Sequence, residues 1–438
     1  MTRASVPIAV PTPLGVVADV SVSRIECHVA ELDRVTGGGV VPGSIVLMGG
    51  EPGIGKSTLL LQFAAGVVKG APVVRHVLYA SGEESGAQVR LRAGRLGLLE
   101  GEAATAIQVV AEAEVGAVIE AARALRPAVL VVDSVQTMRS EDLDGPAGSV
   151  GQVREAAGRL AAFAKSEEIA VILVGHMTKD GSLAGPKTLE HLVDAVLTLE
   201  GDRYASLRVL RATKNRFGST DEVGVFEMGE TGLTEVADPS GAFLVHHVGP
   251  VAGSVVVPTM EGTRPLLVEV QALVGPAGVG PPRRTASGID PNRMALLLAV
   301  LGRHAGIALG THDVYANVAG GLSVSDRGVD LPLSIALASS ARNMPVAAST
   351  VAVGEVGLLG ELRAVPGLER RLREVARLGF VRAIVPAGEA RGRGIDEIET
   401  VAVPTLRDAI AAAFAGGGLP HADGSPPHMT AVGPAMLG

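Results

Sequence analysis

One short segment, Gly50-Glu51-Pro52-Gly53-Ile54-Gly55-Lys56-Ser57, constrains the possible folds of this chain most strongly. It matches the pattern G-x-x-x-x-G-K-[ST] and lies between a short apolar run, residues 45–48, and a helical pattern over residues 56–68. Glycines in such a loop let backbone N–H groups surround phosphate, and the helix N-terminus adds positive potential. The pattern predicts a nucleotide-binding loop that includes Thr58, with Lys56 on the β- and γ-phosphates and the Ser57 hydroxyl on Mg²⁺.

Short apolar runs alternate with helical patterns along the first half of the chain. The strand-like runs cover residues 45–48, 73–80, 129–132, 170–174, 195–199, 207–212 and 223–226. Helical periodicity fills residues 56–68, 88–96, 115–125 and 153–165. Strands that alternate with helices of this length are typical of βαβ units, and near-continuous aliphatic strands fit a mostly parallel sheet that is covered on both faces.

A different pattern begins after a turn-rich stretch, residues 237–250. Two strand-like runs, residues 254–260 and 266–273, flank Glu261-Gly262-Thr263-Arg264, which predicts a hairpin. A Gly/Pro-rich loop at 275–282, a strand at 313–318 and helices at 293–304, 330–341 and 368–378 follow. The sequence therefore predicts a flexible leader at 1–23, a nucleotide-binding domain at 24–245, a second domain at 250–415 and a disordered tail at 416–438.

Composition excludes several other classes of protein. Hydrophobic residues make up 47 % of the chain, too many for a mainly disordered protein. No apolar run reaches the roughly 18 residues needed to cross a bilayer. A single cysteine, Cys27, excludes a disulfide framework and any cysteine-based zinc site. We therefore expect a cytoplasmic globular protein without zinc.

The remaining parts of a nucleotide site are expected at the carboxyl ends of neighbouring strands. Asp133 follows the aliphatic run 129–132, in the Walker B pattern, and is predicted to hold the Mg²⁺ shell through water. Glu83 and Glu84 follow the second strand. We favour Glu83 as the base that polarises the attacking water, with Glu84 as the alternative and a plain acidic helix start as another interpretation. His176 follows the fourth strand and is either a γ-phosphate sensor or a solvated histidine.

Several of these segments together resemble one family. The loop GGEPGIGKSTL, the strand end YASGEES, the segment VVDSVQT, the run GHMTKDGSLAGPKTLEHLVD and above all KNRFG are similar to the bacterial RadA (Sms) family of DNA repair proteins. The resemblance implies an α/β, RecA-like P-loop ATPase core with a mostly parallel sheet, followed by an α+β domain of the Lon-protease-like (ribosomal S5 domain 2-like) fold. It also implies a homo-hexameric ring that acts as an ATP-driven, helicase-like motor. Such a motor promotes branch migration of recombination intermediates on single-stranded DNA, with the recombinase RecA as a partner.

Residue by residue, the resemblance makes Lys56 and Ser57 the Walker A pair, Asp133 the Walker B acid, Glu83 the base and His176 the link between γ-phosphate and the DNA loop. It also implies that Lys214 and Arg216 of KNRFG reach the nucleotide of a neighbouring subunit. The plain alternative is a basic turn anchored by Phe217. The family's four-cysteine zinc finger cannot form with Cys27 alone, so ATP and Mg²⁺ are the expected cofactors and zinc is not.

DNA contacts are harder to locate. A net charge of −8 does not favour DNA binding, but a ring can hold a basic bore inside an acidic exterior. The candidates are Lys179 and Lys187, beside a Gly-rich loop, and Arg283 and Arg284, in the Gly/Pro-rich loop. A crowd of arginines over residues 363–393 is either a further contact or a solvated helix face with i,i+4 ion pairs. Aromatic residues make up only 2 %, so phosphate contacts are expected to dominate base stacking.

Two other functions compete with a DNA motor: an ATP-dependent Lon-like protease, and a RecA-fold switch that binds ATP without translocating. A Lon-type site needs a serine nucleophile and a lysine base, yet the chain has no lysine after residue 214. By the resemblance, Asp330 stands in the nucleophile's place and Glu369 in the lysine's place. Ser334, with His304 or His312 as base, is the remaining substitute. We therefore predict that the second domain is proteolytically inactive.

Overall fold

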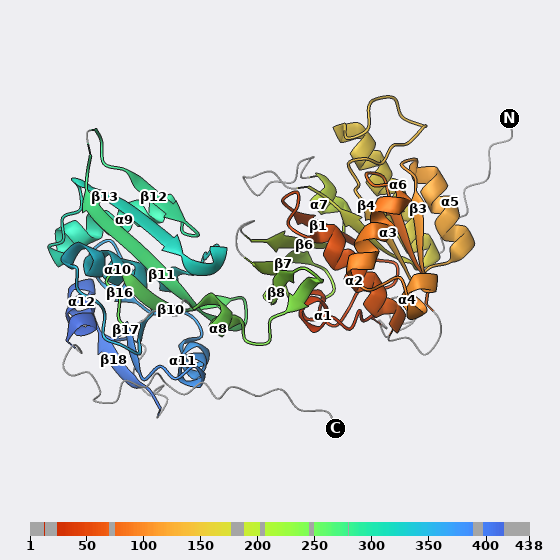
Figure 1. Ribbon diagram of the computed structural model, residues 1–438. Coiled ribbons are helices and arrows are strands. Elements are labelled where there is room, and N and C mark those ends of the chain that lie inside the picture. Colours follow the sequence, from red (N-terminus) through yellow and green to blue (C-terminus); the bar gives the residue numbers. More distant parts are fainter. Residues whose placement is uncertain are drawn as a thin grey trace, which may run out of the picture.

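The computed structural model describes Pro13 and residues 24–69, 75–176, 188–201, 206–244, 249–278, 280–388 and 397–415 (Figure 1). Within these ranges the chain forms two units, each built around its own β-sheet. The rest of the predicted leader, the predicted tail, Lys179 and Lys187 lie outside the described residues. Residues 245–248 do so too, and the predicted division of the chain at 245–250 therefore stays a prediction.

The first unit is an α/β sheet whose described strands have the order β3-β2-β4-β5-β1-β6-β7-β8-β9. The pairs from β3 to β6 are parallel, whereas β7, β8 and β9 continue the sheet in antiparallel fashion. The prediction of a mostly parallel sheet is confirmed. The strands are β1 (Ile45–Gly50), β2 (Val77–Ser81), β3 (Ile107–Ala111), β4 (Val129–Asp133), β5 (Ala170–Val174), β6 (Ala195–Glu200), β7 (Leu207–Asn215), β8 (Val223–Gly229) and β9 (Gly232–Glu235).

Helices cover both faces of this sheet because successive strand residues point to opposite sides. Val46 and Met48 of β1 share a buried cluster with α2, whereas Ile45 and Leu47 share another with α5 and α6. The apolar run of β1 is therefore buried along its whole length. The helices are α1 (Ala30–Thr36), α2 (Lys56–Lys69), α3 (Gly86–Arg95), α4 (Gly101–Ala106), α5 (Val115–Leu125), α6 (Val150–Glu167) and α7 (Thr188–Leu192).

Two features of this unit differ from the sequence prediction. The sequence did not indicate β3 and β9; β3 is an edge strand whose residues are half-buried or exposed, so it lacks an apolar signal. The strand β7 continues to Asn215 because it pairs with β6 beyond the expected end, with Val196 opposite Lys214. Lys214 therefore lies in a strand, beyond the predicted run 207–212 and not in the basic turn that was the plain alternative for KNRFG.

The second unit has a mixed sheet with the order β12-β13-β11-β10-β14-β17-β18, and a separate β15–β16 pair. Glu261 pairs with Arg264, which confirms the predicted hairpin between β10 and β11. The strands are β10 (Ser254–Glu261), β11 (Arg264–Pro276), β12 (Arg284–Ser287), β13 (His312–Val318), β14 (Thr350–Ala352), β15 (Glu355–Val356), β16 (Leu362–Arg363), β17 (Arg382–Pro386) and β18 (Glu399–Val403). The helices are α8 (Pro239–Phe243), α9 (Pro291–Val300), α10 (Asp330–Arg342), α11 (Leu368–Arg377) and α12 (Leu406–Phe414), with a π-helix at Leu301–Ala305 and 3₁₀ turns at Ala319–Gly321 and Arg327–Val329.

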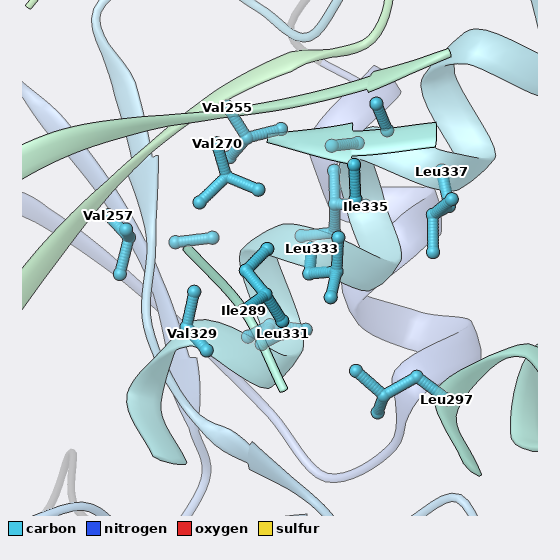
Figure 2. Packing of buried hydrophobic residues seen from close by; sticks show 14 of the residues in the cluster. Val255, Val257, Val270, Ile289, Leu297, Val329, Leu331, Leu333, Ile335 and Leu337 are labelled. Atoms are coloured by element: carbon cyan, nitrogen blue, oxygen red, sulfur yellow. The ribbon is translucent and has the colours of Figure 1, made fainter. Parts of the chain in front are cut away.

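The core of the second unit lies between this sheet and α10. Figure 2 shows Val255 and Val270 of the β10–β11 hairpin near Leu333 and Ile335 of α10, all of them buried. The other side of the sheet is covered by α11, through a separate cluster that includes Leu372. This mixed sheet, in which β13, β11 and β10 pair in antiparallel fashion and helices cover both faces, fits the α+β fold that the resemblance implies. No helix in the described ranges is long and apolar enough to span a membrane.

The two units meet along β7 and β8. Leu207, Val223 and other side chains of these strands belong to the same buried cluster as β10 and β11. Arg264 at the hairpin donates to Glu31 of α1 over 2.7 Å, and Arg211 of β7 pairs with Glu261. The strand β7, whose last two residues are the first two of KNRFG, is therefore in direct contact with the second unit.

Candidate active site

The predicted phosphate loop connects β1 to α2 and has the backbone that its glycines allow. Gly50, Gly53 and Gly55 have φ angles of 151°, 80° and 117°, in the region that favours glycine. A Cβ on Gly50 would lie 2.6 Å from the Leu199 carbonyl oxygen, so no side chain fits there. A Cβ on Gly53 would meet no described atom within 4 Å. The loop thus presents an open backbone face at a helix N-terminus, which fits an anionic phosphate chain.

Lys56, the first residue of α2, is buried with its ammonium group pointing into the loop. Its Nζ donates to the carbonyl oxygens of Gly50 and Glu51 over 2.8 and 2.9 Å. Burial lowers the pKa of Lys56, while the carboxylates of Asp133 and Glu83 oppose that shift. Hydrogen bonds from an ammonium group to charged phosphate oxygens are stronger than those to neutral carbonyl oxygens. The buried Lys56 ammonium group can therefore exchange its two carbonyl partners for phosphate oxygens.

Glu83 and His176 meet Lys56 at the carboxyl edge of the sheet, as the sequence predicts for strand ends. Glu83 Oε1 accepts from the Ser134 hydroxyl over 2.5 Å and lies 3.1 Å from His176 Nε2. The other ring nitrogen, His176 Nδ1, lies 3.5 Å from Lys56 Nζ. The hydrogen bond with His176 is the main cause that lowers the pKa of Glu83 to about 2, against the opposing effect of burial. The four groups form one continuous polar chain around an ionised carboxylate.

Glu84 has a different environment from its neighbour. Both of its carboxylate oxygens accept from the Arg92 guanidinium, each over 2.6 Å. The next residue, Ser85, is the N-cap of α3 and forms a capping box with Gln88. Both glutamates precede this N-cap, so the interpretation of Glu83 and Glu84 as an acidic helix start is wrong. Glu83 contacts His176 and Ser134, and Glu84 contacts Arg92 of the helix.

The metal-site candidates come from two elements, Ser57 from the first turn of α2 and Asp133 from the end of β4. Asp133 is 7 % exposed and accepts from the Tyr79 hydroxyl over 2.5 Å. A carboxylate and a hydroxyl are oxygen donors of the kind that Mg²⁺ takes from proteins, alongside water and phosphate oxygens. The described residues hold no cluster of three His, Cys, Asp or Glu side chains that would suit a metal held by protein alone.

The two cations of KNRFG are bound within their own chain. Lys214 Nζ donates to the carbonyl oxygens of Glu190 and Val193, over 2.6 and 2.7 Å, at the end of α7. Arg216 is 55 % exposed and pairs with the buried Asp194 over 3.1 Å. Phe217 is 37 % exposed, so the ring of Phe217 is not a buried anchor of this turn.

The second unit does not form a Lon-type site from the residues that the sequence named. Asp330 is completely buried and makes a two-pronged ion pair with Arg293, in which Arg293 Nε donates to Asp330 Oδ1 over 2.8 Å. Ser334 is also buried, and its hydroxyl donates to the Asp330 carbonyl over 2.8 Å within α10. Asp330 is thus a structural carboxylate, and Ser334 is engaged with the helix backbone.

Most described arginines in the crowd over residues 363–393 have acidic partners. Arg371 is buried against Asp326, and Arg373 pairs with Glu369 four residues earlier on α11. Arg377 pairs with Glu374 and Asp238. This geometry favours the helix-face interpretation over a DNA contact. Arg283 and Arg284, by contrast, are exposed. Arg284 is the first residue of β12, so its predicted place in the Gly/Pro-rich loop is wrong.

Three residues near the site had no role in the sequence analysis: Tyr79, Ser134 and Arg92. Tyr79 lies within the apolar strand β2, and Ser134 directly follows β4. These two residues come together because β2 and β4 are neighbours in the sheet, with Ser81 opposite Asp133. Arg92 lies on α3, which follows β2. A polar residue within an otherwise aliphatic buried strand was the one available signal, and it applied to Tyr79.

A phosphate loop after a parallel strand, with acidic residues at the ends of neighbouring strands, defines a RecA-like P-loop ATPase, here followed by a Lon-like α+β unit. Comparison with known families agrees: residues 11–182 match the AAA domain, and residues 301–389 match subunit ChlI of Mg-chelatase.

The relatives identify the family. The chain is 47 % identical over 404 residues to DNA repair protein RadA of Halalkalibacterium halodurans, which covers 92 % of this chain and 87 % of the relative. It is 46 % identical to the Bacillus subtilis protein of that name, over 93 % of this chain and 87 % of the relative. For Haemophilus influenzae the identity is 48 %, over 89 % and 83 %. The chain belongs to the DNA repair protein RadA family, which supports ATPase activity and a role in DNA repair.

Proposed function

We propose that this protein is a DNA-dependent ATPase motor of recombinational repair, which promotes branch migration of recombination intermediates along single-stranded DNA. The observation that carries the proposal is the polar chain Lys56–His176–Glu83–Ser134 at the edge of the ATPase sheet. It links the phosphate-binding lysine to an ionised carboxylate through a histidine. That histidine stands directly before residues 177–187, where the family resemblance puts a DNA loop.

Each residue has a distinct task in hydrolysis. Lys56 exchanges its carbonyl partners for the β- and γ-phosphate oxygens and neutralises charge as it develops. Glu83 is ionised at neutral pH, because its pKa is about 2, and accepts a proton from the attacking water. Ser134 and His176 fix the direction of that carboxylate. When bound, Mg²⁺ supplies charge neutralisation on the phosphates, and Ser57 and Asp133 are the groups that would hold it.

The proposal includes a homo-hexameric ring in which Lys214 and Arg216 act on the nucleotide of the neighbouring subunit. Arg216 can do so most directly, since its side chain is 55 % exposed. Lys214 must first leave the carbonyl oxygens of Glu190 and Val193. In this proposal Lys214 gives up its contacts with the end of α7 when it binds the nucleotide of the neighbouring subunit. Ring assembly would then affect α7, the helix that follows residues 177–187.

For DNA we propose phosphate contacts by Lys179, Lys187, Arg283 and Arg284. The exposure of the two arginines supports this assignment, and the lysines rest on the family resemblance. Binding through phosphates is salt-sensitive and largely independent of sequence. By the same resemblance the recombinase RecA is a partner, and the composition favours action in the cytoplasm.

The geometry weighs against the protease alternative. The carboxylate in the nucleophile's place is neutralised by Arg293, and Ser334 is buried within α10. His304 and His312 lie on the π-helix and at the start of β13, and neither ring is within hydrogen-bond distance of the Ser334 hydroxyl in the described structure. We therefore expect no casein cleavage by the full chain with ATP. ATP-dependent cleavage that is lost in Ser334→Ala would overturn this view.

The decisive experiment measures ATP hydrolysis with and without single-stranded DNA. Wild type should be stimulated by DNA, and Lys56→Ala should lose hydrolysis in both conditions. Lys69→Ala is the matched control, because Lys69 is the exposed last residue of the same helix. An absence of DNA stimulation would favour the ATP-switch alternative, and more than a tenth of wild-type hydrolysis in Lys56→Ala would contradict the site itself.

A further inference from the structure

We propose that Tyr79 is a positioning residue of the metal site, whose hydroxyl donates to Asp133 and sets the direction in which the Asp133 carboxylate faces. The inference rests on the proposed function, because it concerns the same site. It assigns to the site a residue that belongs to neither the Walker A nor the Walker B segment.

Tyr79 occupies a place where the fold needs only an apolar side chain. It lies on β2, between β3 and β4, and is completely buried. Its strand neighbours Leu78 and Ala80 are apolar and equally buried. Its ring belongs to the cluster that includes Leu60 and Phe63 of α2. A phenylalanine would satisfy this packing, so the hydroxyl is an added polar group whose burial is unfavourable unless it is hydrogen-bonded.

The hydroxyl is hydrogen-bonded to one of the groups proposed for Mg²⁺. Tyr79 Oη donates to Asp133 Oδ2 over 2.5 Å, across the neighbouring strands β2 and β4. Outer groups that hydrogen-bond a metal ligand fix its orientation, and their loss costs about 10–100-fold in metal affinity.

The test measures ADP affinity by calorimetry, in Mg²⁺ and in EDTA, for wild type and Tyr79→Phe. The ratio of the two dissociation constants reports the contribution of Mg²⁺ to binding. We expect this ratio to fall about tenfold in Tyr79→Phe, while the affinity in EDTA stays unchanged. Tyr315→Phe, in β13 of the second unit, is the control and should keep the wild-type ratio.

A double-mutant cycle separates positioning from general structure. If Tyr79 acts through Asp133, then Tyr79→Phe has no further effect on the ratio once Asp133→Asn is present. An unchanged ratio in Tyr79→Phe, equal weakening of binding in Mg²⁺ and EDTA, or full additivity with Asp133→Asn would each overturn the inference. Failure of wild type to bind ADP at all would instead overturn the proposed function.

Discussion

Glu83 and Glu84 are adjacent in sequence but have different electrostatic environments. Glu83 faces His176 and Ser134 with its pKa lowered to about 2, and Glu84 is occupied by Arg92. We expect Glu83→Gln to reduce the rate of ATP hydrolysis about 10²–10⁴-fold and to leave ATP binding intact, because a general base is lost while the phosphate loop is untouched. Glu84→Gln, measured beside it for turnover and ATP affinity, should retain most of the rate. The reverse pattern would identify Glu84 as the base.

His176 lowers the pKa of Glu83, and this effect gives a prediction about the pH dependence of hydrolysis. The largest cause of the low pKa of Glu83 is its hydrogen bond with His176. In wild type the carboxylate is already ionised at pH 5, so it contributes no acidic limb to kcat/KM near that pH. In His176→Ala the pKa of Glu83 should rise toward its ordinary value, because burial then acts with less opposition. The acidic limb of kcat/KM should move to higher pH.

The matched control for this pH profile is His191→Ala, which alters a histidine on α7. It should keep the wild-type profile. An identical acidic limb in wild type and His176→Ala, with measurable turnover in both, would show that His176 does not tune the base.

At the scale of elements, the sequence predicted best where periodicity and burial coincide. The strand at Ala170–Val174 and the helix at Val115–Leu125 have the bounds that their apolar patterns indicate. The carboxyl-edge placement of Asp133, Glu83 and His176 followed from the parallel sheet alone. Elements such as β3 and β18 were missed, because edge strands that are partly exposed carry little apolar signal.

The partners of side chains could not be predicted in this way. Tyr79 meets Asp133 only because β2 and β4 are neighbours in this register, and no spacing in the sequence encodes that contact. Similarly, Lys214 caps α7 because β7 pairs with β6 further than its apolar run suggests. Residue types at strand ends were therefore predictable, whereas the hydrogen bonds that set their charge and direction were not.

The start of α10 supplies a prediction about stability. Asp330 is completely buried, and the Arg293 side chain is 15 % exposed. Their ion pair joins the start of α10 to the first turn of α9, and the Val356 N–H of β15 also donates to Asp330. Asp330→Ala leaves the arginine charge unpaired, which costs about 3–5 kcal/mol for a buried pair. We expect the urea midpoint of the second unit in the full chain to fall markedly. Ser334→Ala removes only a hydroxyl one turn away and should shift it little; equal shifts would mean that the ion pair is not a major stabilising contact.

At the scale of the whole molecule, the proposed ring requires that a site be completed by two subunits. Arg216→Ala should abolish hydrolysis while each subunit still binds ATP. Arg216 follows β7, and β6 separates β7 from β1 and its phosphate loop, so the substitution leaves that loop unaltered. Lys56→Ala should also be inactive, but through the loss of its own loop. Binding of ATP and the melting temperature of both variants establish that each one is folded.

Mixing the two inactive variants then distinguishes action in trans from action in cis. In a mixed ring, some interfaces join the intact loop of an Arg216→Ala subunit to the intact Arg216 of a Lys56→Ala subunit. If Arg216 acts on the neighbour's nucleotide, these interfaces are complete and hydrolysis returns in part. If it acts within its own chain, no arrangement of the two variants contains a complete site, because every subunit lacks one of the two residues. Mixed assembly without recovered hydrolysis would therefore restrict Arg216 to its present partner, Asp194, and to a structural role.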